Sequence, residues 1–211
     1  MLKAIIFDFD GTLLDSDKMI VETFRQLYEM FKPTIKPDLE HFLSFSGPPI
    51  KESLKKEFPD IDQDYAFEQF QYLSEDNYIK YVKPFPYAID TLKELKKRNI
   101  KIALVTSKGR AATEFALKLT SLNNIFDFII CADEVKKVKP NPEGVLLALK
   151  YLNIENKNEA IYIGDSRYDY LTAKNANLKF GYVSFSPRKL LDNEKADIYI
   201  SSFKNFVEEV L

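Results

Sequence analysis

The amino-acid sequence predicts an α/β fold, a doubly wound parallel sheet with a small all-helical domain inserted into it. Three observations support this fold class. Short apolar runs recur along the chain, amphipathic helical patterns alternate with most of them, and one long stretch contains helical patterns alone. The 211 residues are enough for one good core and a small second unit.

The predicted strands are short apolar runs rich in β-branched or aromatic residues. They lack polar alternation, which is typical of strands buried on both faces of a sheet. The runs occupy residues 4–7, 102–105, 128–130, 160–163, 180–183 and 197–200. Amphipathic helical patterns occupy residues 87–99, 110–122 and 142–153. This alternation predicts a parallel sheet with helices on both faces.

The stretch after the first predicted strand breaks this alternation. Residues 16–82 carry four helical patterns and no buried-strand run, and Pro84 and Pro86 mark the return to the alternating pattern. We therefore expect a helical cap domain at 16–82, with residues 1–15 and 83–211 forming the α/β core. The alternative is one long helical excursion within a single domain.

The composition excludes several classes of function. The net charge of −2 gives no basic surface for nucleic acid and no polybasic segment for a membrane. No apolar stretch is long enough to span a bilayer, and we expect no signal peptide. A single cysteine, Cys131, cannot form an internal disulfide, so we expect a cytoplasmic location. The sequence does not distinguish a monomer from a dimer.

Polar side chains follow several of the predicted strands. Because the carboxyl ends of parallel strands meet at one edge of a sheet, these side chains should converge where ligands bind. Four carboxylates in one place favour a bound cation, and oxygen ligands without Cys or His favour Mg²⁺. The residues are Asp8, Asp10, Thr106, Ser107, Lys139, Asp165 and Asp169.

These residues form four motifs that together resemble those of the haloacid-dehalogenase superfamily of phosphohydrolases. The motifs occur in the family's order and extend along the whole chain, and the helical insertion fits the position of the family's cap domain. Residues 45–54 and 105–110 further resemble the branch of phosphoglycolate phosphatases and pyrophosphatases. The motifs are Asp8-Phe9-Asp10-Gly11-Thr12, Thr106 at a strand end, Lys139 in KPNPEG, and Gly164-Asp165-Ser166-Arg167-Tyr168-Asp169.

The resemblance implies a Mg²⁺-dependent phosphatase that acts on a small phosphorylated metabolite. Asp8 would be the nucleophile that forms an aspartyl-phosphate, and Asp10 would be the general acid and then the general base. The side chains of Asp8 and Asp165 and the backbone carbonyl of Asp10 would hold the metal.

Further polar groups would support the metal and the phosphoryl group. Asp169 would assist through water or through Lys139, and Lys139 would offset negative charge on the phosphate. Thr106 would donate hydrogen bonds to the transferring phosphoryl group, with the backbone N–H groups of Phe9 and Ser107 as further donors.

The remaining candidate residues have simpler interpretations. Cys131 is predicted to lie in the core and His41 on the surface. Asp15 and Asp17 are predicted to lie at a helix start. The sequence leaves two interpretations of Lys108, as a site residue or as a surface residue. The aromatic residues of the predicted cap are interpreted as packing residues. They are Phe24, Tyr28, Phe31, Phe42, Phe67, Phe70 and Tyr72.

The identity of the substrate is left open between related reactions. Phosphoglycolate is the first expectation and pyrophosphate the second, with a phosphosugar mutase as a further alternative. The cap should discriminate between substrates, and Gly47 and Lys51 in its rigid Gly-Pro-Pro turn are candidate substrate-binding residues. Outside the enzymes, we consider a phospho-receiver domain, although a receiver needs neither a general acid nor a cap, and a binding protein that has kept the fold.

Overall fold

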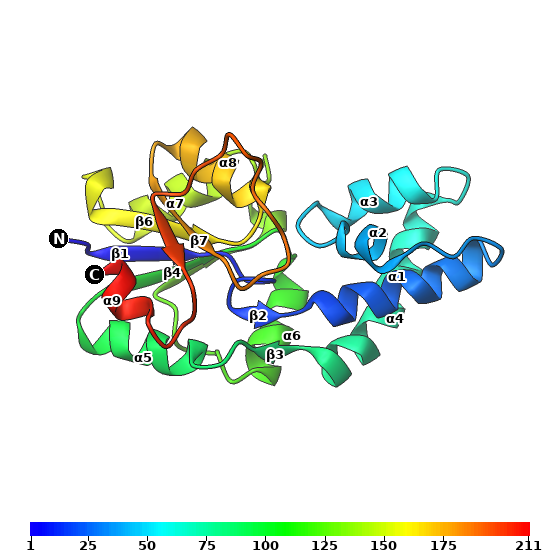
Figure 1. Cartoon of the computed structure of the whole chain (residues 1–211), viewed down its shortest axis with the longest axis horizontal. Helices are drawn as coiled ribbons and strands as arrows, with labels where there is room; N and C mark the ends of the chain where they lie inside the picture. Colours follow the sequence, from blue (N-terminus) through cyan, green and yellow to red (C-terminus); the bar gives the residue numbers. More distant parts are fainter. The chain divides into compact units, whose positions relative to one another are not determined.

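The computed structural model describes residues 1–211 and contains a six-stranded, entirely parallel sheet (Figure 1). The strand order is β5-β4-β1-β6-β7-β8. The strands are β1 (Ala4–Phe7), β4 (Lys101–Val105), β5 (Phe128–Ile130), β6 (Ala160–Gly164), β7 (Lys179–Val183) and β8 (Ile198–Ile200). The predicted parallel sheet is confirmed, with each strand within one residue of its predicted bounds.

Helices cover both faces of this sheet, as predicted. The helices α7 (Glu143–Tyr151) and α8 (Arg167–Ala176) contact each other and pack on one face, and α5 (Ala88–Lys97) and α9 (Phe206–Val210) pack on the other (Figure 1). The remaining helical elements of this part of the chain are α6 (Arg110–Leu119), η1 (Ala132–Glu134) and η2 (Lys157–Glu159).

The strand β1 is the centre of the core. All four of its residues are fully buried, and it pairs with β4 on one side and β6 on the other. An entirely apolar strand is stable here because both of its faces are covered by helices and both of its edges are hydrogen-bonded. The free thiol of Cys131 is buried, as expected, and burial raises its pKa to about 11.

The chain divides into two compact units, one formed by Met1–Leu14 with Pro84–Leu211 and one by Asp15–Lys83. The first unit contains the parallel sheet. The second contains α1 (Asp17–Phe31), α2 (Leu39–Leu43), α3 (Ile50–Glu57) and α4 (Gln63–Tyr81). Short strands β2 (Leu14–Asp15) and β3 (Lys83–Pro84) pair where the chain passes from one unit to the other.

Aromatic side chains form the core of the helical unit. The rings of Phe24 and Phe45 stack with centroids 4.0 Å apart, and Tyr28 packs edge-on against Phe58 at 5.2 Å. Polar groups also join α1 to α4, since the Asn77 amide donates to the Thr23 hydroxyl at 3.0 Å. The interpretation of the aromatic residues as packing residues is wrong for Tyr72, whose side chain is 74% exposed.

His41, expected at the surface, is only partly exposed. Its ring is 37% exposed, with Nε2 3.1 Å from the Tyr28 hydroxyl and 3.2 Å from Glu57 Oε2. The Tyr28 hydroxyl donates to the same Glu57 oxygen at 2.5 Å. Glu57 needs these donors because its side chain is nearly buried, so His41 belongs to a polar cluster that joins α1, α2 and α3.

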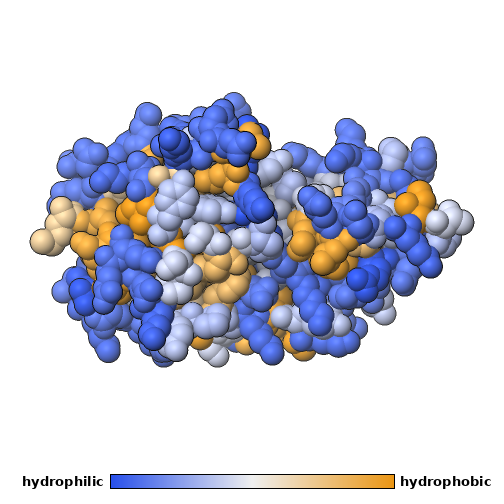
Figure 2. Space-filling model, viewed as in Figure 1, coloured by the Kyte–Doolittle hydropathy of each residue, from blue (hydrophilic) through white to orange (hydrophobic).

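Hydrophilic residues cover most of the face shown in Figure 2, and apolar residues reach that surface only in small groups. None of the helices combines the length and the apolar character needed to cross a membrane.

Candidate active site

The carboxyl ends of β1 and β6 lie side by side because these strands pair in parallel, with Phe7 opposite Ile163. Asp8 directly follows β1, and its backbone N–H continues the pairing by donating to Ile163 O at 2.8 Å. The order of the strands along the chain reverses between β1 and β6. Ligands bind at such reversal points in open α/β sheets. Asp8 and Asp165 therefore lie where the topology favours a ligand site.

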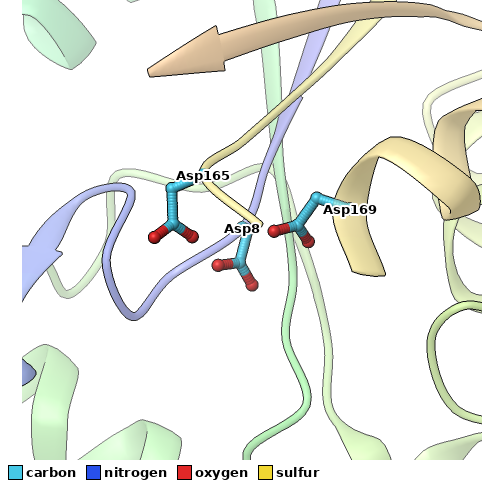
Figure 3. A group of neighbouring side chains, drawn as sticks. All are labelled: Asp8, Asp165 and Asp169. Atoms are coloured by element: carbon cyan, nitrogen blue, oxygen red, sulfur yellow. The ribbon is translucent and has the colours of Figure 1, made fainter. Parts of the chain in front are cut away.

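Three carboxylates meet at this point, from Asp8, Asp165 and Asp169. One oxygen from each lies within 4.8 Å of the others, and all three residues are buried. Figure 3 shows the three side chains directed toward a common region, with Asp169 projecting from the start of α8. Three buried like charges at this distance repel strongly unless positive charge lies between or beside them.

Lys139 supplies part of that positive charge. Its ammonium group lies 2.6 Å from Asp8 Oδ1 and 2.7 Å from Asp169 Oδ1, and its side chain is only 7% exposed. The three groups form a buried ion triad, in which the hydrogen bonds offset the cost of removing the charges from water.

The loop before α7 places Lys139 in this position. The Glu143 carboxylate, at the start of α7, accepts hydrogen bonds from the backbone N–H groups of Lys136 and Lys137 at 2.9 and 3.0 Å. The Asn175 amide donates to Pro140 O at 2.9 Å, which ties the loop to α8. Because the backbone is held on both sides of Lys139, its side chain is directed into the carboxylate cluster.

Asp169 is fixed by a capping box at the start of α8. Its Oδ2 accepts from the Ser166 backbone N–H at 3.1 Å and from the Ser166 hydroxyl at 2.6 Å. Its Oδ1 accepts from the Tyr162 hydroxyl at 3.0 Å, in addition to Lys139. Gly164 makes this packing possible, because a Cβ there would overlap the Asp169 side chain. Both oxygens of Asp169 are thus occupied by protein donors.

The Asp165 carboxylate has two different surroundings. Its Oδ2 accepts a hydrogen bond from the Ser186 hydroxyl at 2.8 Å and one from the Arg188 guanidinium. Its Oδ1 lies 3.4 Å from the Thr12 hydroxyl, which is also 3.4 Å from Asp8 Oδ2. Asp8 Oδ2 and Asp165 Oδ1 therefore face the same small region.

Asp10 directly precedes a tight turn. Gly11 adopts a positive φ of 82°, and its N–H donates to Leu14 O at 2.7 Å, so the chain reverses immediately after Asp10. The Asp10 carboxylate is separate from the three-carboxylate cluster. Its Oδ2 lies 3.1 Å from the Lys108 ammonium, and its Oδ1 is buried without a hydrogen-bond partner.

The charges in the cluster depend on one another. Burial alone lowers the pKa of Lys139, but the carboxylates of Asp169 and Asp8 outweigh burial and raise that pKa well above its usual value. Burial alone raises the pKa of Asp169, but Lys139 and the hydrogen bonds from Ser166 outweigh it and lower that pKa. Lys139 and Asp169 are therefore an ionised pair at neutral pH.

Opposing effects act on the pKa values of Asp8 and Asp165. Burial, reinforced by the negative charge of Asp169, raises the pKa of Asp8 to about 8, although Lys139 acts in the opposite direction. Burial also raises the pKa of Asp165, although Arg188 lowers it. One further positive charge beside these two carboxylates would stabilise their ionised forms.

The oxygens left by these contacts fit a hard divalent cation. Asp8 Oδ2 and Asp165 Oδ1 face one region, are buried, and carry the charge that such an ion needs. Oxygen donors without nitrogen or sulfur suit Mg²⁺. Asp169 fits the role of a group that holds Lys139 better than that of a direct ligand, because all four of its contacts are to protein donors.

The structure gathers most of the predicted site residues at this edge of the sheet. Thr106 is buried directly after β4, its hydroxyl accepts from the Lys108 N–H at 3.1 Å, and Ser107 follows in the same loop. Lys108 therefore lies at the site, beside Asp10. Gly47 and Lys51 belong to the helical unit, where the Lys51 ammonium lies 4.7 Å from the centroid of the Phe67 ring.

Sequence reasoning assigned no role to five residues that contact the carboxylates. Thr12 and Ser166 occur within the motifs without a role of their own, and Tyr162 lies within an apolar strand, where a tyrosine is usually a packing residue. Ser186 and Arg188 fall in the long connection between β7 and β8, which carries no motif. The one available signal was the position of these two residues just beyond the carboxyl end of a core strand.

Comparison with known proteins agrees with this geometry. The family model of haloacid dehalogenase-like hydrolases matches residues 5–183. The pyrophosphatase PpaX of Bacillus anthracis is 30% identical over 211 residues, which cover 98% of this chain and 95% of the Bacillus protein.

Two solved structures extend the comparison. A candidate haloacid dehalogenase-like hydrolase from Bacteroides fragilis is 30% identical, with a TM-score of 0.81 over 96% of this chain and 98% of that one. A candidate phosphoglycolate phosphatase from Lactobacillus plantarum has a TM-score of 0.84 over 99% of both chains at 23% identity, which shows a shared fold.

Proposed function

Because this chain belongs to the haloacid dehalogenase-like hydrolases, we propose that it is a Mg²⁺-dependent phosphatase that hydrolyses a small phosphorylated metabolite through an aspartyl-phosphate. The observation that carries the proposal is the position of Asp8. Its carboxylate lies at the reversal point of the sheet, 2.6 Å from the Lys139 ammonium and in one cluster with Asp165 and Asp169. A nucleophile for an anionic phosphate needs such neutralising charge beside it.

Asp8 Oδ2 and Asp165 Oδ1 would hold Mg²⁺, and the backbone carbonyl of Asp10 is a further candidate ligand. When bound, the ion supplies positive charge that offsets the charge of the phosphate and of the Asp8 carboxylate. Asp169 would contribute by holding Lys139 through the 2.7 Å contact.

In the first step, an oxygen of Asp8 would attack phosphorus, and the bond from phosphorus to the leaving oxygen would break. Asp10 would give its proton to that leaving oxygen. The separation of Asp10 from the three-carboxylate cluster supports this role, because its side chain is then available for proton transfer.

In the second step, Asp10 would take a proton from water, and the water oxygen would attack the phosphorus of the aspartyl-phosphate. The bond from phosphorus to Asp8 would break and release inorganic phosphate. Lys108, 3.1 Å from Asp10 Oδ2, would hold the Asp10 side chain in place during this transfer. Thr106 and Ser107 would donate hydrogen bonds to the phosphoryl oxygens.

Phosphoglycolate is the first candidate substrate, and residues 45–54 and 105–110 resemble the branch that contains both phosphoglycolate phosphatases and pyrophosphatases. Pyrophosphate is the second, favoured by the 30% identity to pyrophosphatase PpaX over nearly the whole chain. Both carry an anionic group beyond the scissile phosphate, which Lys51 and the turn at Gly47 would bind. The site residues of the α/β unit would bind the phosphoryl group of any of these substrates in the same way. We therefore assign the discrimination between substrates to the helical unit.

The test is a panel of phosphorylated metabolites with released phosphate as the readout, in the presence of Mg²⁺ and with the Asp8→Asn variant as control. We expect one small anionic substrate to exceed p-nitrophenyl phosphate in kcat/KM. Conversion of a sugar phosphate to its isomer without release of phosphate would favour a mutase. A chain that accepts phosphate once and turns over no substrate would favour a receiver domain.

A further inference from the structure

The two oxygens of Asp165 are treated differently by the protein. Ser186 donates to Oδ2 at 2.8 Å, and the Nε of Arg188 donates to the same oxygen. Oδ1 instead lies beside the Thr12 hydroxyl, together with Asp8 Oδ2. Figure 3 shows the Asp165 carboxylate beside that of Asp8. One oxygen of Asp165 is thus held by the connection that follows β7, and the other faces the candidate metal position.

The connection between β7 and β8 is shaped to make this contact. The Tyr182 hydroxyl, near the end of β7, donates to the backbone carbonyl of Arg188, and the Arg188 N–H lies 3.4 Å from the Ser186 hydroxyl. The Arg188 side chain is 12% exposed. A charged side chain this deeply buried implies a defined position beside its carboxylate.

Gly11 provides the space that this arrangement needs. A Cβ at position 11 would overlap both the Arg188 guanidinium and Asp165 Oδ2. Gly11 also has a positive φ of 82°, which side chains rarely adopt. The glycine of the first motif therefore serves two purposes in this chain, the turn after Asp10 and the close approach of Arg188 to Asp165.

We propose that Ser186 and Arg188 are positioning residues that restrict Asp165 to ligation through one oxygen, and so make the site select Mg²⁺ over Ca²⁺. The proposal rests on the function proposed above. Mg²⁺ takes six ligands in a strict octahedron, to which a carboxylate contributes one oxygen. Ca²⁺ takes up to eight and readily binds both oxygens of a carboxylate. Donors that occupy Oδ2 remove the second oxygen, which only the larger ion uses.

A restriction on Asp165 can be distinguished from repulsion between the Arg188 charge and the bound cation. A guanidinium beside the site weakens the binding of every divalent cation through repulsion, and removal of that charge strengthens the binding of Mg²⁺ and Ca²⁺ by the same factor. A restriction on Asp165 instead changes the ratio of the two dissociation constants. Ser186→Ala removes one hydrogen-bond donor to Asp165 without any change in charge. This variant therefore tests the restriction on Asp165 separately from the effect of charge.

The experiment measures Mg²⁺ and Ca²⁺ binding to the metal-depleted full chain by isothermal titration calorimetry. The proteins are the wild type, Ser186→Ala, Arg188→Gln and the double variant. Lys189→Gln is the matched control, because Lys189 is the exposed neighbour of Arg188 and loses the same charge. Circular dichroism and thermal melting confirm that each variant is folded.

We expect Ser186→Ala and Arg188→Gln each to shift the ratio of Kd for Mg²⁺ to Kd for Ca²⁺ toward Ca²⁺, with the double variant shifting it by about fivefold or more. Lys189→Gln should leave the ratio unchanged. An unchanged ratio in the double variant, or an equal gain for both ions, would overturn the proposal. A wild type that binds neither ion would instead overturn the metal site of the proposed function.

Discussion

The ammonium of Lys139 lies 2.6 Å from Oδ1 of Asp8 although 131 positions of chain separate the two residues. Both side chains are nearly buried, and the same ammonium also contacts Asp169. The lysine thus holds the candidate nucleophile and its neighbour in one ion triad. Loss of the lysine would leave two buried carboxylates without this compensation.

Replacement of Lys139 by Met should therefore reduce both stability and activity. Breaking a buried ion pair costs about 3–5 kcal/mol, which for a chain of this size lowers Tm by roughly 10 °C. Differential scanning calorimetry measures the loss, and phosphate release measures activity. Lys137→Met is the control, because Lys137 is exposed in the same loop. Equal Tm values for the two variants would contradict the structural role of Lys139.

The Asp8→Asn variant should be folded but inactive. Asn keeps the shape of the side chain but removes the attacking carboxylate and one candidate metal ligand, so turnover should fall by about a thousandfold or more. Steady-state phosphate release measures the effect, and circular dichroism checks the fold. Near-normal turnover by this variant would exclude the covalent mechanism.

Asp8→Asn should also stabilise the metal-free protein, and more so at pH 8 than at pH 5. Burial raises the pKa of Asp8 from 3.8 to about 8. Well below pH 3.8 the residue is protonated in both the folded and unfolded states, so there is no penalty. As pH rises toward 8, Asp8 ionises in the unfolded state before it ionises in the folded state, so the free energy of unfolding of the wild type falls. Asn has no such penalty.

Thermal melting in the presence of chelator, from pH 5 to pH 8, measures this difference. The Tm advantage of the variant over the wild type should grow by roughly 5 °C or more across that interval. Saturating Mg²⁺ should reduce this increase of the Tm advantage with pH, because the ion stabilises the ionised Asp8 carboxylate of the wild type. Parallel Tm profiles for the two proteins without metal would show that Asp8 does not titrate as argued.

Removal of divalent metal should abolish activity, and addition of Mg²⁺ should restore it. Ca²⁺ should bind but inhibit, because its larger and looser coordination shell displaces Asp8 from its line of attack. The measurement is phosphate release after treatment with chelator, followed by titration with each ion. Full activity in excess chelator would rule out the metal site.

Variants of the helical unit should separate substrate recognition from chemistry. Lys51→Ala and Gly47→Val should lower kcat/KM for the physiological substrate by about tenfold or more, because each affects the turn proposed to bind the distal anion. Hydrolysis of p-nitrophenyl phosphate, which has no distal anion, should change far less.

The two variants test this turn in different ways. Gly47 has a φ of 111°, which strains valine, so Lys51→Ala is the cleaner variant. Equal losses on both substrates would place the determinant of specificity elsewhere in the helical unit.

The sequence alone was sufficient for the parts of the fold that depend on neighbouring residues. Continuous apolar runs predicted all six strands of the parallel sheet, because burial on both faces leaves no polar alternation. The motifs placed Asp8 and Asp165 at strand ends, since motif and strand are adjacent along the chain. Parallel pairing then brings those two ends together whatever the details of packing.

Only the tertiary structure decided the contacts between distant segments. Arg188 and Ser186 reach Asp165 from a connection without a motif, and Tyr162 bonds Asp169 from within an apolar strand. His41 meets Glu57 where a surface position was expected. Such contacts depend on strand register, loop path and the need of buried polar groups for partners, and these are properties of the packed chain that no local pattern encodes.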